Sequence, residues 1–325
     1  MNAMRLACLL LASAVLAGCA SAPATSPAIP GAPPAPTLLA ELLHKPVYRM
    51  TPFEAGQYIT HMHGAQPDLR KRIAAIGRQN IGQPYSLNLL GEFPYEIHDS
   101  LPLFSLAQSD CVVFAEHTYA MALSQSWEEF FWMLQRIRYR DGVIGVATRN
   151  HYTEMDWNVA NRWLVTDISA ELAGSVAGGT GPSYGLTVDR ARFLRTRHNT
   201  VRAIPIETSR QAYVAKEQVA AIAGQLQEGD LVNVISTRDG EYWASHVGLV
   251  VLGPGGERHF LHSSEPQVRE ETFDAYITRT LERQQRAARE GKRGQSLAGF
   301  KFLRLNAQIA VPPMAPQPRP GPPAA

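Results

Sequence analysis

The sequence predicts an α+β fold in which helices come first and strands follow. Residues 111–123 carry apolar side chains at helical spacing, and the Ser-Asp pair just before them is typical of a helix N-cap. Within residues 228–262, three apolar runs separated by turns indicate consecutive strands. Because the strands follow the helices instead of alternating with them, the order favours α+β over a doubly wound sheet.

Composition restricts the possible partners. The chain has 325 residues and a formal net charge of +2 without a long basic run, so nucleic-acid binding has no electrostatic support. His61 and His63 are two potential metal ligands without a third, and no His-Glu-x-x-His motif is present. We therefore expect no metal and no cofactor, and a zinc-dependent hydrolase is disfavoured.

The amino-terminal residues predict export and lipid anchoring. An apolar run from Leu6 to Leu16 is shorter than the roughly 20 residues that a transmembrane helix needs. Leu16-Ala-Gly-Cys19 resembles the acylation box of bacterial lipoproteins, so residues 1–18 would be the signal peptide and Cys19 the lipidated residue. The alternative is an ordinary signal peptide with an incidental cysteine. Ala20 resembles an outer-membrane address, which predicts an envelope lipoprotein facing the periplasm.

Two segments rich in proline and alanine flank the expected folded body. Residues 19–40 form the lipidated cysteine and an extended linker, because such a composition buries too little apolar surface to fold. Residues 311–325 are a similar tail, which we expect to be disordered. Residues 41–310 remain as the body.

Cys111 is the only cysteine expected in the body, since Cys8 leaves with the signal peptide and Cys19 carries lipid. A lone cysteine has no disulfide partner, so it is either a buried structural thiol or a reactive one. At the first turn of the predicted helix, unpaired amides and the positive end of the helix dipole favour a thiolate. This position predicts a nucleophile with a lowered pKa.

His246 and His262 are the expected base and its orienting partner. They lie on two successive predicted strands and flank the turn at residues 253–256 almost symmetrically, so an antiparallel hairpin brings them close together. Gly248 lies on the same strand face as His246 and is expected to leave room for a helix end to approach. The alternative is two unrelated histidines on a solvated sheet face.

Four motifs resemble the NlpC-type, papain-like cell-wall cysteine hydrolases. They are Gly82-Gln-Pro-Tyr85, Asp110-Cys-Val-Val-Phe114, Ser245-His-Val-Gly-Leu249 and Phe260-Leu-His-Ser-Ser264. The two valines after the cysteine depart from the small hydroxyl residues common in that superfamily. The resemblance implies a papain-like fold, in which the helix that carries the nucleophile packs on an antiparallel half-barrel sheet, with a helical and loop insertion.

Over about residues 74–305 the chain looks most like the amidase-like branch known as domain of unknown function 1460. Its features appear in Arg138-Tyr-Arg-Asp-Gly142, Arg149-Asn-His-Tyr152 and Asp156-Trp157. The resemblance implies an N-acetylmuramoyl-L-alanine amidase whose partner is peptidoglycan or a released muropeptide. Plausible substrate contacts are Arg149, His151, Tyr152, Asp156 and Trp157; the alternative is that these residues only pack together.

The resemblance also implies catalytic roles. Cys111 would attack the amide carbonyl, His246 would transfer protons, and His262 would orient His246. The Cys111 amide and the Tyr85 side chain would stabilise the oxyanion. Three alternatives stay open: a γ-D-glutamyl-diamino acid endopeptidase of the same fold, a non-catalytic lipoprotein that binds peptidoglycan, and acyl transfer through the same thiol.

Overall fold

The structure is a computed structural model that describes residues 36–96 and 99–317. The predicted signal peptide, Cys19 and the linker up to residue 35 lie outside the described residues. None of the helices in the described ranges combines the length and the hydropathy that a bilayer span requires.

Helices dominate the first half of the described chain. They are α1 (Pro36–His44), α2 (Pro52–Ala65), α3 (Leu69–Arg78), α4 (Cys111–Leu123) and α5 (Trp127–Arg138). Helix α4 begins where the sequence predicts, because the Asp110 carboxylate accepts hydrogen bonds from the amides of Val112 and Val113 at 2.9 and 2.8 Å. In α5 the Ser126 hydroxyl accepts from the Glu129 amide in the same way.

A seven-stranded antiparallel sheet lies at the centre of the fold, and its presence confirms the predicted α+β class. Its order is β1 (Val165–Asp167), β9 (Ser296–Leu305), β5 (Leu231–Arg238), β6 (Glu241–Leu252), β7 (Arg258–Ser264) and β8 (Gln267–Thr272), with β4 (Val214–Ala215) paired to β9. The three predicted strands correspond to β5, β6 and β7. Asp239 and Gly240 connect β5 to β6 with φ values of 55° and 84°, as a two-residue hairpin turn requires.

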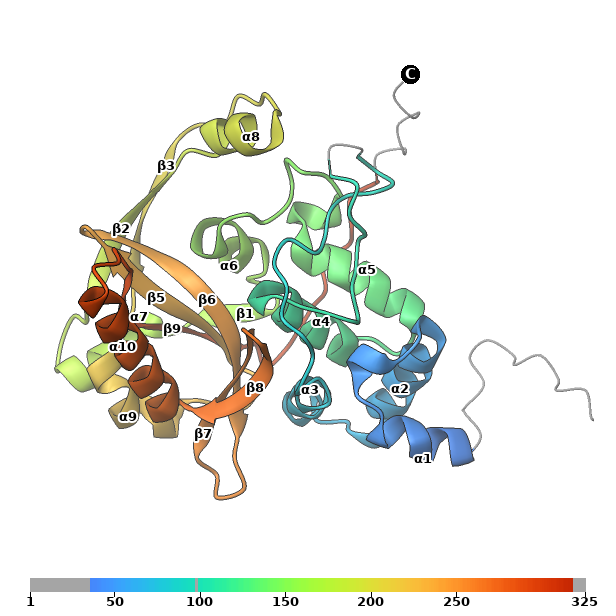
Figure 1. The fold of residues 1–325 in the computed structure, drawn as a ribbon. Coiled ribbons are helices and arrows are strands. Elements are labelled where there is room, and N and C mark those ends of the chain that lie inside the picture. The colour runs from blue at the N-terminus through green and yellow to red at the C-terminus, as the bar shows by residue number, and fades with distance from the viewer. Residues whose placement is uncertain (1–35, 97–98, 318–325) are drawn as a thin grey trace, which may run out of the picture. The chain divides into compact units, whose positions relative to one another are not determined.

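Helices cover both faces of the sheet (Figure 1). Helices α2 to α5 pack on one face, where Leu249 and Leu261 are fully buried. The other face carries Val250 and Phe260, which pack against α7 (Ser169–Ala177), α9 (Val219–Ile222) and α10 (Phe273–Arg289). Alternate residues of β6 and β7 therefore belong to two separate cores, which fixes the register of these strands.

The insertion between α5 and the sheet includes an arm that extends from the body (Figure 1). It follows a π-helical turn (Thr153–Trp157) and α6 (Asn158–Ala160), and consists of β2 (Ser183–Val188), α8 (Arg190–His198) and β3 (Glu207–Ala212). Strands β2 and β3 pair with each other in a two-stranded sheet. The sequence predicted a helical and loop insertion there but not this separate hairpin.

Helix α10 is absent from the sequence prediction, which placed strands alone after residue 230. Phe273, Tyr276 and Thr280 are buried at spacings of three and four residues. This is the pattern of an amphipathic helix, so the signal was present in the sequence.

The carboxyl-terminal segment was predicted to be disordered from residue 311. The structure describes residues 311–317, and these make hydrogen bonds to the region after α5. The Gln317 side chain accepts from the Ile144 amide at 3.0 Å and donates to the Gly142 carbonyl at 2.7 Å. Residues 318–325 lie outside the described residues.

Gly248 on β6 packs tightly against side chains of β7. A Cβ atom built on Gly248 would lie 2.5 Å from Phe260 Cε2 and 2.7 Å from His262 Cβ. The expectation that this glycine leaves room for a helix end is therefore wrong. The space is filled by the neighbouring strand, which lets His262 sit directly beside β6.

We predict that Gly248→Ala lowers the free energy of unfolding by about 1–3 kcal/mol, because the added methyl group overpacks the β6–β7 contact. Gly185→Ala is the matched control, since Gly185 also lies in an antiparallel strand but a Cβ atom added there would meet nothing within 4 Å. Urea denaturation of both variants measures the difference. Equal stability of the two variants would contradict the prediction.

Candidate active site

Two buried serines tie the start of α4 to β7. The Ser109 hydroxyl lies 2.7 Å from Gln83 Oε1, and the Ser263 hydroxyl donates to the Ser109 carbonyl at 3.0 Å. Ser109 precedes Cys111 by two residues, and Ser263 directly follows His262. These bonds therefore hold the cysteine beside the strands that carry the two histidines.

Tyr85 is held against the same junction by backbone pairing. Its amide donates to the Pro266 carbonyl at 2.9 Å, and the residue forms an isolated β-bridge with Ser109. Gly82, at the start of the Gly-x-Pro-Tyr motif, has a φ of 90°, which favours glycine. Burial raises the pKa of the Tyr85 phenol to about 12, so the hydroxyl keeps its proton at neutral pH.

His246, His262 and Glu271 form a hydrogen-bonded chain. His246 Nε2 lies 2.8 Å from His262 Nδ1, and His262 Nε2 lies 2.9 Å from Glu271 Oε1. The ladder between β6 and β7 ends at the Leu249–Leu261 pair, and both histidines lie beyond it. The structure therefore brings the two predicted histidines into direct contact, although they do not face each other across a ladder.

The geometry of this chain determines where its protons lie. A carboxylate only accepts hydrogen bonds, so His262 Nε2 must carry hydrogen to donate to Glu271. In neutral His262 the Nδ1 atom is then an acceptor, and His246 Nε2 must donate to it. A neutral His246 consequently has its lone pair on Nδ1, which is the nitrogen left to act as a base.

Both histidines are neutral at pH 7. Burial lowers the pKa of His246 well below its usual value, and the positive charges of Arg279 and Arg283 lower it further. Burial also lowers the pKa of His262, although the hydrogen bond to Glu271 opposes this effect.

Glu271 is ionised and firmly held. Burial alone would raise its pKa, but hydrogen bonds from His262 and Arg279 outweigh burial and bring the pKa to about 2. The Arg279 guanidinium lies 2.5 Å from Glu271 Oε1. Arg279 therefore terminates the chain that begins at His246.

Cys111 lies at the amino terminus of α4, as predicted, but its pKa does not follow the prediction. Burial raises the pKa of the thiol to about 12, and the neighbouring Asp110 carboxylate acts in the same direction. The amides of Val247, Val112 and Cys111 itself favour the thiolate, as expected at a helix start, but they are outweighed. Without substrate, the Cys111 side chain is therefore a neutral thiol. It lies near the backbone amide of Val247, the residue that follows His246.

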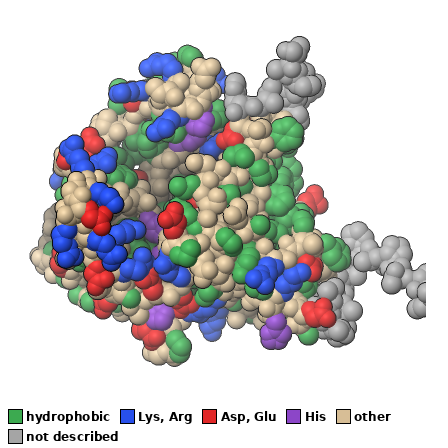
Figure 2. Space-filling view, viewed as in Figure 1, with side chains coloured by type: hydrophobic (Ala, Val, Ile, Leu, Met, Phe, Trp, Pro, Cys, Tyr) green, Lys and Arg blue, Asp and Glu red, His purple; other side chains and the backbone are tan. Residues whose placement is uncertain are grey.

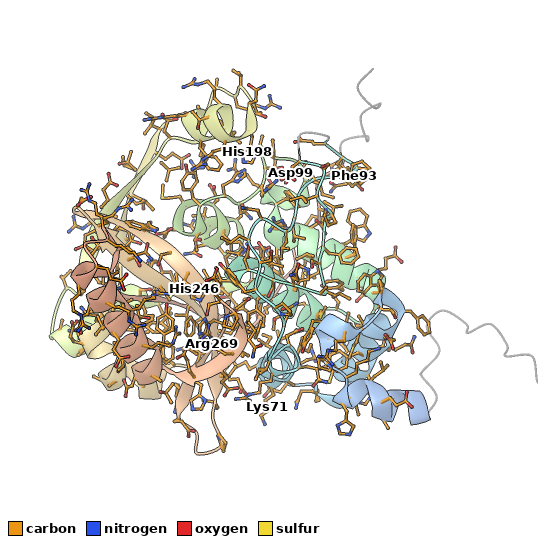
Figure 3. The ribbon with its side chains drawn as sticks, in the orientation of Figure 1. Lys71, Phe93, Asp99, His198, His246 and Arg269 are labelled. Carbon is orange, nitrogen blue, oxygen red and sulfur yellow. The ribbon has the colours of Figure 1, made fainter. Side chains whose placement is uncertain are left out.

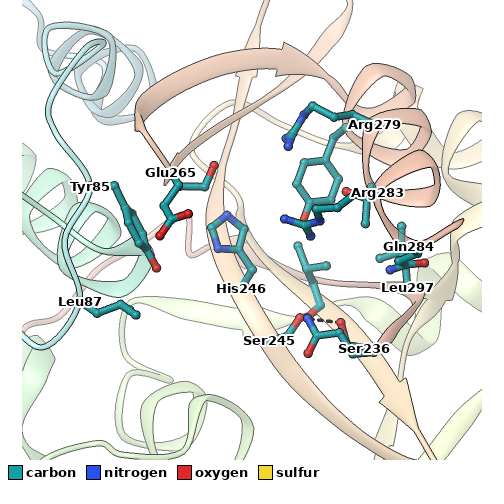
Figure 4. A pocket seen from close by; sticks show the side chains of 15 residues that line it. Tyr85, Leu87, Ser236, Ser245, His246, Glu265, Arg279, Arg283, Gln284 and Leu297 are labelled. Carbon is teal, nitrogen blue, oxygen red and sulfur yellow. Dashed lines mark hydrogen bonds between the residues drawn. The ribbon is translucent and has the colours of Figure 1, made fainter. Parts of the chain in front are cut away.

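A polar cleft of about 240 Å³ opens beside His246 (Figure 4). Tyr85 and Glu265 lie on one side of the imidazole, and Arg279 and Arg283 lie on the other. The lining includes residues from β5, β6 and α10 as well as the segment that contains Tyr85.

Arg149, Asp156 and Tyr152 make contacts elsewhere and do not line this cleft. Arg149 pairs with the buried Glu92 and, at 2.8 Å, with Asp99. Asp156 accepts from the Arg190 guanidinium at 2.6 Å, and the Tyr152 ring packs against Phe193 in the arm. Arg149 faces a separate cavity that His198 and Asp99 also line, away from His246 (Figure 3).

Trp157 and His151 do not line the cleft beside His246 either. Both line a small cavity of about 40 Å³ together with Val112 and Val247, the residues that follow Cys111 and His246. Trp157 also donates to the buried Glu116 carboxylate at 3.0 Å. Of the five insertion residues proposed as substrate contacts, these two share a cavity with the sequence neighbours of Cys111 and His246.

Sequence reasoning did not identify Glu271, Arg279 or Arg283. Glu271 lies nine residues after His262 on the next strand, and Arg279 and Arg283 lie on the helix that the prediction lacked. A recognised amphipathic α10 would have placed both arginines one turn apart on the same helix face.

The family model of AmiA-like, N-acetylmuramoyl-L-alanine amidase-like proteins matches residues 75–287, which is more than half of the chain. This match confirms the resemblance to the amidase-like branch. Among curated proteins, none matches the sequence.

Two solved structures have a similar fold. A protein of the domain-of-unknown-function 1460 family from Legionella pneumophila is 18% identical with a TM-score of 0.63, over 80% of this chain and 96% of that chain. An N-acetylmuramoyl-L-alanine amidase from Bacteroides uniformis is 18% identical with a TM-score of 0.55, over 73% of this chain and 98% of that chain.

We predict that iodoacetamide alkylates Cys111 slowly in the folded protein, because only the thiolate reacts and its fraction falls tenfold for each pH unit below the pKa. The rate should keep rising with pH beyond about pH 10, where the same cysteine in urea has reached its plateau. Peptide mapping after alkylation isolates the Cys111 peptide from those of other cysteines. A plateau below about pH 8.5 in the folded protein would show a lowered pKa and contradict the prediction.

Proposed function

The chain belongs to the N-acetylmuramoyl-L-alanine amidase-like family, and on this basis we propose that it is a cysteine-dependent peptidoglycan hydrolase. Its bond would be the amide between N-acetylmuramic acid and L-alanine of the stem peptide. The observation that carries the proposal is the chain from His246 through His262 to Glu271, at a cleft that Tyr85 also lines. The Cys111 thiol lies near the backbone amide of Val247, the residue that follows His246. A protein that only binds peptidoglycan has no need of such an arrangement.

In the proposed reaction Cys111 attacks as a neutral thiol that loses its proton during the attack. The proton moves to His246 Nδ1, the unprotonated nitrogen, and the sulfur bonds to the amide carbonyl carbon. The Cys111 amide and the protonated Tyr85 hydroxyl would donate to the resulting oxyanion. His246 then returns the proton to the departing amine, which leaves an acyl group on the sulfur.

Water completes the cycle. His246 removes a proton from a water molecule as that water attacks the thioester, and it returns the proton to the thiolate when the acid leaves. His262 and Glu271 hold the imidazole and stabilise the imidazolium that forms at each step. The ionised state of Glu271 supports this role, because a negative charge near the relay favours a positive His246.

We also propose the papain-like relationship and the envelope location as parts of the same function. Helix α4 packs on β6 and β7 in the manner that a papain-like nucleophile helix requires. The lipoprotein box at Cys19 and the address at Ala20 support anchoring at the outer membrane, facing the periplasm. An anchored hydrolase would work beside its polymer.

We predict that Cys111→Ala abolishes hydrolysis of a defined muropeptide while the unfolding midpoint changes little, because the substitution removes only the nucleophile. Mass spectrometry of the wild-type products should find peptides with a free amino-terminal L-alanine. A free diamino-acid terminus would instead show an endopeptidase. Unchanged turnover in Cys111→Ala, or loss of wild-type activity with EDTA, would contradict the thiol mechanism.

We predict that Glu271→Gln lowers kcat about tenfold or more with little change in KM. The substitution weakens the hydrogen bond to His262, the residue that orients the base His246. The acid limb of the kcat/KM profile should also move to lower pH. Removing the negative charge destabilises the protonated form of His246 and so lowers its pKa further.

Glu270→Gln is the matched control on the adjacent residue of β8. Glu270 accepts from His259 at 2.8 Å and from Arg78, and alternation along the strand directs it to the opposite face from Glu271. Its kcat and pH profile should match those of the wild type. Equal effects of the two substitutions would show a structural role for this strand instead of a relay.

A further inference from the structure

One wall of the cleft beside His246 carries two arginines. Arg279 and Arg283 are four residues apart on α10, so both side chains lie on the same helix face and line the cleft (Figure 4). The floor next to them is polar, because Ser236 and Ser245 are hydrogen-bonded to each other at 2.7 Å. Lys and Arg side chains gather over α10 in the space-filling view (Figure 2).

The guanidinium groups of Arg279 and Arg283 differ in their contacts. Arg279 pairs with Glu271 and lies over the Tyr276 ring, with its Cζ atom 5.5 Å from the ring centroid. Arg283 is exposed, and none of the ion pairs between described residues involves it. Its charge is therefore available to a ligand that enters the cleft.

The acidic group that lines the cleft lies elsewhere. Glu265 is beside Tyr85, on the opposite side of His246 from the arginines (Figure 4). The cleft consequently has a positive side and a negative side with the imidazole between them. A substrate that places an anionic group on the α10 side would meet an unpaired guanidinium.

The spacing suits a group close to the scissile bond. The Tyr276 ring contacts both His246 and Arg279. Its centroid lies 6.3 Å from the centroid of the His246 ring and 5.5 Å from Arg279 Cζ. An extended peptide advances roughly 3.5 Å per residue, so a carboxylate one or two residues from the scissile amide reaches this wall. Guanidinium groups bind planar carboxylates through paired hydrogen bonds.

We propose that Arg283, supported by Arg279, forms a subsite for the free α-carboxylate of the D-glutamyl residue that follows L-alanine in the stem peptide. This inference rests on the proposed function. Arg283 is the determinant of specificity, whereas Arg279 also holds Glu271 and so serves the relay. The enzyme therefore selects stem peptides in which this carboxylate is free over those in which it is amidated.

Two synthetic substrates that differ only at this group test the subsite. One is N-acetylmuramoyl-L-alanyl-D-glutamate γ-amide, whose α-carboxylate is free, and the other is the corresponding diamide. Wild-type protein should have a kcat/KM about tenfold higher for the carboxylate, as expected for one charge-assisted contact. Arg283→Gln should remove this preference, mainly by raising KM for the carboxylate, so that the two substrates are cleaved with equal kcat/KM.

Arg286→Gln is the matched control, because Arg286 lies on the same helix but does not line the cleft. It should keep the wild-type preference. Equal wild-type rates on the two substrates, or an equal loss on both in Arg283→Gln, would overturn the subsite while leaving the proposed function intact. Failure of the wild type to cleave either substrate, with product analysis as above, would overturn the proposed function itself.

Discussion

The buried hydrogen bonds between Ser109 and Ser263 are the contact on which the arrangement of the site depends. They join segments 154 residues apart in sequence, one leading into α4 and the other following His262. Other polar contacts also join the helices to the sheet, such as the hydrogen bond from the Tyr119 hydroxyl to the Gly229 carbonyl, but they lie farther from Cys111 in the sequence. Hydroxyl and carbonyl groups in a dry interior must find partners, so this junction admits few alternative positions. Because a serine side chain is short, these hydrogen bonds also limit the distance between the start of α4 and β7.

Burial determines the charge state of the site more than any single neighbour does. It keeps the thiol and both imidazoles neutral, and it is overcome only at Glu271, where two donors converge on one carboxylate. Because burial disfavours a resting thiolate and imidazolium, the two charges form only as the sulfur attacks the substrate. The helix dipole at Cys111 acts in the expected direction but is smaller than the cost of burying a thiolate.

Much of this site can be predicted from the sequence, and the remainder cannot for identifiable reasons. Cys111 was predicted from cysteine counting and a helix start, and the contact between His246 and His262 from two strands that flank one turn. Glu271 depends on how β8 follows β7, which no local pattern specifies. The raised pKa of Cys111 depends on side chains from distant segments that exclude water. Arg283 was missed for a different reason, because the helical spacing of α10 was present in the sequence but was not recognised.

The raised pKa of Cys111 bears on the chemical durability of the protein. Peroxides and disulfides attack thiolates far faster than thiols, and oxidation beyond the sulfenic acid is essentially irreversible. A sulfur that stays protonated at rest is protected from these reagents, and the described structure offers it no neighbouring cysteine for a disulfide. Burial at the start of α4 thus keeps the Cys111 sulfur reduced in the absence of substrate.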